Sequence, residues 1–189
     1  EYYAASYQTL SAGSGKYSEF AVLATEDSTT VEIIPTRSDI GSKRVANVSY
    51  QVKLNKGDVY QYQSFNDLSG SYIKSVASAT APCKPIAVFS GSSWTAMGCS
   101  NASSGDNLYQ QMFPFSSWGK IYYTAPFKNK SYDIFRIFVQ DPSEIVYVDG
   151  VALNQSSIIS NRYYDLSTSG NNKAQVISSN KPICVLQYI

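Results

Sequence analysis

The stretch Phe20–Ile33, FAVLATEDSTTVEI, decides the fold. It holds two short runs of apolar and β-branched residues separated by the turn residues Glu-Asp-Ser, which is the pattern of a β-hairpin rather than a helix. A related stretch, FRIFVQDPSEIVYV, occupies Phe135–Val148, 115 residues further along the chain. The sequence therefore predicts the same hairpin twice.

Three further pairs of stretches match in the same order: EYYAASY (1–7) with IYYTAPF (121–127), GDVY (57–60) with NRYY (161–164), and KPIAV (84–88) with KPICV (181–185). The spacing falls from 120 residues between Tyr2 and Tyr122 to 97 between Lys84 and Lys181. Valine-rich strands can look alike by composition, but four matches in one order favour a duplication with shorter loops in the second copy. We predict a single domain over 1–189 built from units of about 1–120 and 121–189, which superpose and share one core.

Strand signals dominate the rest of the chain. Short apolar runs bounded by turn residues recur roughly every 8 to 12 residues without amphipathic helices between them, which predicts an all-β fold, an antiparallel sandwich or barrel-like pair of sheets. Asp149-Gly150 indicates a tight hairpin. One helical turn is plausible at DNLYQQMF (106–113), ending before Pro114. Trp118, beside an apolar strand, is expected in the core.

Composition excludes several classes of protein. Hydrophobic residues make up 43% of the 189 and charged residues 15%, which is not the composition of a disordered chain or a coiled coil. The net charge of +1 argues against a nucleic-acid partner. No apolar run approaches the roughly 20 residues of a membrane-spanning helix, so we expect no membrane insertion by this segment.

Catalytic and metal-binding residues are not indicated. The chain has no histidine, which excludes a Ser-His-Asp or Cys-His arrangement, and it has no closely spaced cysteine pair or Asp-x-Asp-x-Asp run to hold a metal. A carboxylate pair from Glu26 and Asp27, or from the set 133, 141 and 144, could formally serve glycoside hydrolysis. Because these residues lie at predicted turns, we interpret them as turn-capping side chains and predict no enzyme and no cofactor.

The abundance of Ser, Thr, Tyr and Asn is typical of β-rich extracellular domains. Possible N-glycosylation sites lie at Asn47, Asn101, Asn129 and Asn154. The polar stretch Ser92–Asp106 is the longest in the chain and is predicted to be a loop that carries recognition. An aromatic residue in such a loop often contacts a partner, so Trp94, Asn101, Asp106 and Tyr109 are the candidate binding residues.

The assembled stretches resemble the N-terminal domain family of the IgG Fc-binding protein. The likeness covers nearly the whole chain and rests on the order of SEFAVLATEDSTTVEIIPT, LNKGDVYQYQS, DLSGSYI, KPIAVFSG, DNLYQQMFPFSSWGK, YYTAPF and KPICVLQY. The resemblance implies a non-catalytic adhesion or protein-interaction module of a large secreted or cell-surface protein, mucus- or matrix-like, of which this chain is expected to be a piece. The partner is expected to be a protein or glycan, and a carbohydrate-binding module using the Trp94 loop is the alternative.

The three cysteines provide a test of the extracellular prediction. We expect a disulfide between Cys83 and Cys99, with Cys184 buried and unreactive in its apolar run; a Cys83–Cys184 bridge is the alternative. A disulfide that closes the loop from Cys83 to Cys99 would stabilise the fold by about 3 kcal/mol. Peptide mapping under non-reducing conditions checks the pairing, and finding Cys184 in the bridge would show that the pairing is wrong.

Overall fold

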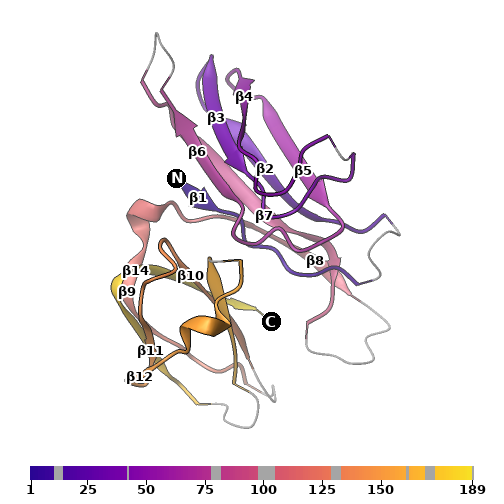
Figure 1. The fold of residues 1–189 in the computed structure, drawn as a ribbon. Helices are drawn as coiled ribbons and strands as arrows, with labels where there is room; N and C mark the ends of the chain where they lie inside the picture. Colours follow the sequence, from indigo (N-terminus) through magenta and orange to yellow (C-terminus); the bar gives the residue numbers. More distant parts are fainter. Residues whose placement is uncertain are drawn as a thin grey trace. The chain divides into compact units, whose positions relative to one another are not determined.

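The computed structural model describes residues 1–10, 15–41, 43–77, 82–97, 105–128, 133–160, 162–168 and 173–188. The chain divides into two compact units, Glu1–Pro114 and Phe115–Ile189. Both are all-β, and every strand pairing in them is antiparallel, as predicted (Figure 1). Among the described residues, no helix has the length and apolar character needed to cross a membrane.

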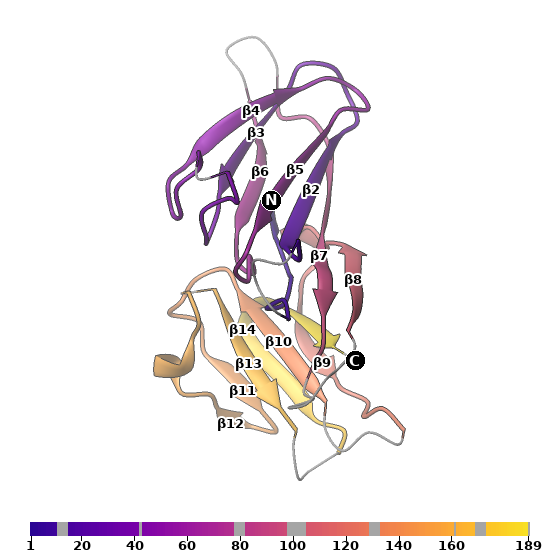
Figure 2. The ribbon, with the colours of Figure 1, turned by 90° about the vertical axis from the view of Figure 1, so that its right-hand side faces the viewer.

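The first unit contains two four-stranded sheets. One has the order β1 (Tyr2–Tyr3), β6 (Tyr72–Val76), β3 (Thr29–Ile34), β4 (Tyr50–Leu54). The other has the order β5 (Val59–Ser64), β2 (Ser18–Ala24), β7 (Ile86–Thr95), β8 (Asp106–Gln111). Figure 2 shows β3 and β4 in one layer and β2 and β5 in the other.

The core of the first unit is made by the apolar residues that alternate along these strands. Residues with no exposed surface come from both sheets: Phe20, Val22, Val31, Ile33, Ile73 and Val88. Tyr62 on β5 stacks on Phe20 with ring centroids 5.0 Å apart, and its ring also lies 6.4 Å from that of Tyr50 on β4. The aromatic side chains therefore join the two sheets.

The second unit forms one six-stranded sheet around a single long strand. The strands are β9 (Gly119–Tyr123), β10 (Ile134–Val139), β11 (Val146–Val148), β12 (Val151–Ala152), β13 (Tyr163–Ser167) and β14 (Val176–Tyr188). Two 3-10 turns accompany them, η1 (Phe115–Ser117) and η2 (Gln155–Ser157). Strand β14 pairs with β9, β10 and β11. The predicted Asp-Gly hairpin joins β11 to β12, with φ of 50° at Asp149 and 82° at Gly150, values that suit a two-residue hairpin turn.

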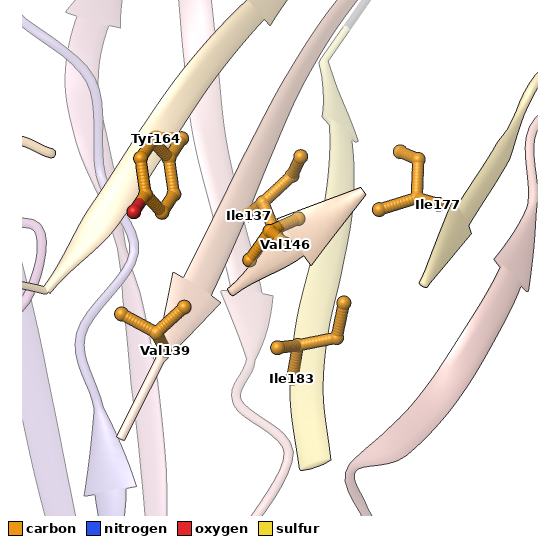
Figure 3. Packing of buried hydrophobic residues seen from close by; sticks show 6 residues of the cluster. All are labelled: Ile137, Val139, Val146, Tyr164, Ile177 and Ile183. Atoms are coloured by element: carbon orange, nitrogen blue, oxygen red, sulfur yellow. The ribbon is translucent and has the colours of Figure 1, made fainter. Parts of the chain in front are cut away.

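The core of the second unit uses the same kind of side chains. Six buried residues from β10, β11, β13 and β14 form a cluster, shown in Figure 3: Ile137, Val139, Val146, Tyr164, Ile177 and Ile183. Each is at most 2% exposed. Burial of such side chains is the main stabilising term, worth about 1.5–3 kcal/mol for each aliphatic residue.

The opposite face of β10 is also buried and carries an arginine. Arg136 is 2% exposed, and its guanidinium donates to both carboxylate oxygens of Asp165 at 2.7 and 2.9 Å. The rings of Tyr163 and Tyr188 lie 4.3 and 5.5 Å from the guanidinium carbon. A buried charge persists only when it is paired in this way.

The two units have the same pattern of strand pairing. Phe20 on β2 lies opposite Tyr62 and Ser90, and the matching Phe135 on β10 lies opposite Leu166 and Gln187. Leu166 follows Tyr62 by 104 residues and Gln187 follows Ser90 by 97, which are the spacings of the neighbouring sequence matches. Tyr2 on β1 likewise lies opposite Ile73, as Tyr122 on β9 lies opposite Ile177. These registers agree with a duplication, which stays a prediction, as does a core shared by both units.

The shorter second copy has a structural reason. In the first unit β6 and β7 are separate strands, with residues 77–85 between them. In the second unit both counterparts lie in β14, whose first half pairs with β11 and whose second half pairs with β10. The connection between the halves is therefore seven residues shorter, which accounts for the fall in spacing from 104 (Tyr60 to Tyr164) to 97 (Lys84 to Lys181).

Two sequence-based expectations about local structure are wrong. Residues 106–111 within DNLYQQMF form strand β8 instead of a helical turn, because they pair with β7. The apolar run SSIIS (156–160) has the short, bounded pattern that predicts strands elsewhere in the chain, yet it contains part of η2 and one isolated bridge from Ile159 to Tyr163. Trp118 is buried at 9% exposure against Phe115, with ring centroids 4.5 Å apart, as its predicted core position requires.

The two hairpin turns differ at one matched position, which is Thr29 in the first unit and Glu144 in the second. Thr29 in the first unit is fully buried, and its hydroxyl donates to the Glu26 carbonyl within the turn at 2.7 Å. Its counterpart Glu144 is 1% exposed, and its Oε1 accepts from the Asp141 amide at 3.1 Å. Glu144 Oε2 and the buried Tyr164 hydroxyl have no hydrogen-bond partner among the described residues. The second turn therefore buries a carboxylate that is only half satisfied.

We expect Glu144→Gln to stabilise the protein at pH 7. Burial raises the pKa of Glu144, while the hydrogen bond from the Asp141 amide and the charge of Lys181 oppose the rise. A raised pKa means that the folded state binds the proton more tightly, so the cost of the ionised carboxylate is present at high pH and disappears as the pH falls through the folded-state pKa. The gap in Tm between Glu144→Gln and the parent should therefore be largest near neutral pH and narrow as the pH falls.

Thermal melts of both proteins between pH 4 and 8 measure that gap. A gap that does not change with pH, or a parent that is the more stable protein at pH 7, would contradict the assignment of a buried ionised carboxylate. Asp141→Asn is the control, because the amide and hydroxyl of Ser143 lower the pKa of this exposed carboxylate and its pH dependence has the opposite sign.

Candidate functional site

Three of the four predicted binding residues lie on the β7–β8 pair of strands. Asp106 and Tyr109 belong to β8 and are exposed. Trp94, predicted to be in a polar loop, instead lies near the end of β7 and is half-buried, which corrects the sequence-based interpretation. The connection between the strands covers residues 96–105 only. Asn101 lies outside the described residues.

Trp94 is held from two sides. The ammonium group of Lys16 lies 5.1 Å from the centre of the indole ring, within the range of a cation–π interaction. On β8's side of the hairpin, a Cβ at Gly105 would come within 2.9 Å of the indole Nε1 and 2.7 Å of the Thr95 carbonyl oxygen. Glycine at position 105 is therefore what lets the connection return so closely past Trp94.

A second glycine sets the distance between β7 and β8. Gly91 lies opposite Tyr109, and a Cβ built on it would overlap the Leu108 carbonyl oxygen and lie 2.8 Å from the Tyr109 Cα. The pairing register shifts between Ser92 and Thr95, a bulge that bends the end of β7. Together the glycine and the bulge position β8 and the aromatic ring it carries.

That ring belongs to a polar and aromatic face on the outside of the sheet. Tyr109 is 46% exposed and stacks on Phe89 of β7, with centroids 6.0 Å apart and the rings inclined by 5°. On the neighbouring strands, Glu19 Oε2 accepts from the side-chain amides of Gln61 at 2.9 Å and Gln63 at 2.8 Å. Burial raises the pKa of Tyr109, and the charge of Glu19 adds to the effect, so the phenol remains a neutral donor.

Sequence reasoning missed Glu19, Gln61, Gln63 and Phe89. Each alternates with a core residue on a strand that the sequence does predict, so the period-two pattern places it on the outward face. The period-two pattern does not predict the order of the strands in the sheet. The order β5-β2-β7-β8 is what brings these four side chains and Tyr109 together.

The predicted catalytic alternatives have structural roles. Asp27 Oδ1 accepts from the Lys56 amide at 3.0 Å, and Asp141 Oδ1 accepts from the Ser143 amide at 2.9 Å, which is the turn chemistry expected for these residues. Asp133 is buried and bonds Gln187 at 3.1 Å. In the part of the chain that the structure describes, no group of three or more His, Cys, Asp or Glu side chains could hold a metal ion.

The remaining predicted residues are only partly described. Asn47 and Asn154 are exposed, and Asn154 caps η2 by accepting from the Ser156 amide. Asn129 and Cys99 lie outside the described residues. Cys83 is exposed, Cys184 is buried, and the two are not bridged to each other, which excludes the alternative pairing; a bridge from Cys83 to Cys99 stays a prediction. Burial raises the pKa of the Cys184 thiol to about 12, which keeps it unreactive.

The chain thus consists of two all-β units, the first of which carries Tyr109, Phe89 and two glutamine amides bonded to Glu19 on one sheet face. The chain belongs to the IgGFc binding protein family, whose profile it matches over residues 1–189. The family is one of non-enzymatic, typically extracellular binding domains. No curated protein and no solved structure matches the chain.

Gly91→Ala tests the close approach of the two strands. Because the new methyl group would overlap the backbone of β8, we expect a loss of about 1–3 kcal/mol, the range for overpacking a tight contact, together with detachment of β8. Urea unfolding measures the loss, and Tyr109 fluorescence or NMR shifts report the detachment. Gly57→Ala is the control, since its added Cβ meets no atom within 4 Å, although its φ of 86° carries its own cost. If Gly91→Ala leaves the β8 signals unchanged, the contact is not essential.

Proposed function

We propose that this chain is a non-catalytic extracellular module that binds another protein, in adhesion or matrix assembly by a secreted or cell-surface protein. The observation that carries the proposal is the exposed strand β8, which Gly91 lets approach β7 and whose Tyr109 stacks on Phe89. Rigid aromatic side chains beside a polar rim are the usual anchors of protein interfaces, because they bury much area at a small entropic cost.

The same surface is poorly suited to catalysis. Glu19 is its carboxylate, and two glutamine amides already occupy one of its oxygens. A general acid or base must reach the substrate to exchange a proton, whereas Glu19 is only 9% exposed. The arrangement instead fixes Glu19 as an acceptor that orders Gln61 and Gln63, which supports recognition by hydrogen bonding.

The family description makes the Fc fragment of immunoglobulin G the first protein to test. A carbohydrate ligand is the second candidate, favoured by one observation: the stacked Phe89–Tyr109 pair lies on the same sheet face as amide and carboxylate groups. Sugars bind to such faces by packing their CH groups on an aromatic ring while their hydroxyls bond neighbouring polar side chains.

Tyr109→Ala should weaken binding at least tenfold and leave the fold intact, because an exposed anchor contributes more to an interface than to the core. Trp94→Ala should weaken binding as well, with a larger loss of Tm because its ring is half-buried. The matched control is Tyr123→Ala in the second unit, which removes a tyrosine that is 79% exposed. Biosensor binding to the Fc fragment, a glycan array and thermal melts on the same variants check these expectations.

Loss of Fc binding in Tyr109→Ala but not in Tyr123→Ala supports a protein-binding surface on β7 and β8. Glycan binding with the same sensitivity would assign the face to carbohydrate instead. Turnover on a polysaccharide panel, or binding that all three variants retain, would overturn the proposal.

A further inference from the structure

Strand β8 stands at one end of its sheet in the order of the described strands (Figure 2). It pairs with β7 alone among the described strands. The Met112 amide donates to the Val88 carbonyl at 2.7 Å. This bond shows which residues of β8 direct their backbone groups toward β7, because the direction alternates along the strand. Leu108 and Gln110 turn their backbone groups toward β7, so those of Tyr109 and Gln111 point away from the sheet.

The other edges of the first unit are protected. At β5, the Gln63 carbonyl on the outer side accepts from the Ile40 amide at 3.0 Å, so the segment around Ile40, which precedes β5 in the chain, lies against that edge. Strand β1 is only two residues long, and β4 carries an exposed lysine, Lys53. Short length, coverage and lysine are the usual devices that prevent an edge from pairing with another chain.

Among the described residues of the first unit, strand β8 shows none of these devices. Its six residues, DNLYQQ, include no lysine and no proline, and five of the six are exposed. Beside the open edge, Tyr109 and Phe89 provide a stacked aromatic surface on one sheet face. An edge of this kind is a template for another strand.

We propose that β8 binds an extended segment of a partner protein, which adds a strand to the sheet. This inference rests on the proposed protein-binding function and names how the partner is held. The segment bonds the outward amide and carbonyl groups of Tyr109 and Gln111, and alternate side chains of it lie over the Tyr109 ring. That position suits a β-branched or aromatic residue.

Charge complementarity favours a foreign segment over a second copy of this chain. Asp106 is the one charged residue of β8 and is exposed. In a symmetric pair of β8 strands no basic residue would face it, because the strand contains none. A partner segment with Lys or Arg at its end next to Asp106 would meet that carboxylate.

Gln111→Pro tests the backbone contact directly. Proline removes the outward amide of residue 111 and spares the ladder to β7, since that amide faces away from the sheet. Gln111→Ala is the matched control, which loses the side chain and keeps the amide. Phage selection of random linear heptapeptides on the parent protein supplies the probe. We expect enriched peptides that bind Gln111→Ala normally and Gln111→Pro at least tenfold more weakly, with both variants melting close to the parent.

Hydrogen exchange measured by NMR gives a second readout. In the free protein the amides of Tyr109 and Gln111 should exchange fast while those of Leu108 and Gln110 are protected by β7. Peptide binding should protect Tyr109 and Gln111. Failure to enrich any peptide, equal binding to the proline and alanine variants, or exchange at Tyr109 that the peptide does not change would each overturn strand addition.

The outcomes also separate this inference from the proposed function. If a protein ligand needs the Tyr109 ring but ignores Gln111→Pro, the module binds proteins through its face and not its edge. If sedimentation shows a dimer of the parent that Gln111→Pro dissolves, the edge is occupied by a second copy and the partner segment is wrong.

Discussion

The pairing between a central strand and the strand that follows Lys-Pro organises both units. β2 pairs with β7 along its whole length, and β10 pairs with the second half of β14 in the matching register. This pairing places Val22 and Ile137 on the buried side of each unit, and the hairpin partners β3 and β11 complete the core. Since a slip of one residue would exchange the two faces of these strands and turn Val22 and Ile137 away from their core clusters, the side-chain pattern fixes the register.

Lysine at the start of the Lys-Pro strand reinforces that register. The Lys84 ammonium donates to the Asp27 carbonyl in the β2–β3 turn, and the Lys181 ammonium lies 3.4 Å from the Asp141 carboxylate in the β10–β11 turn. Both contacts are exposed and add little to stability by themselves. In both units, therefore, the lysine of the Lys-Pro pair contacts an aspartate of the hairpin turn, although the other turn residues differ.

The sequence predicts the repeated hairpins because their strands are short apolar runs and both turns carry Asp and Ser. It fails at β8, whose residues Asp-Asn-Leu-Tyr-Gln-Gln have weak strand propensity and become a strand only because Gly91 lets them approach β7. The sequence also predicts the wrong environment for Trp94. The serines around it suggest a loop, although this segment ends a strand that pairs with β2 and β8. The buried Arg136 has no local signal, since its partner Asp165 is 29 residues away.

The continuous strand β14 has a mechanical consequence. In the first unit, β6 and β7 belong to separate sheets, and residues 77–85 connect them. In the second unit, one backbone of thirteen residues runs through both halves of the sheet and bonds β9, β10 and β11. Tension along β14 loads the ladders to β9, β10 and β11 together in shear, whereas in the first unit β6 and β7 load two separate sheets; the second unit is therefore expected to yield in one step and the first in stages.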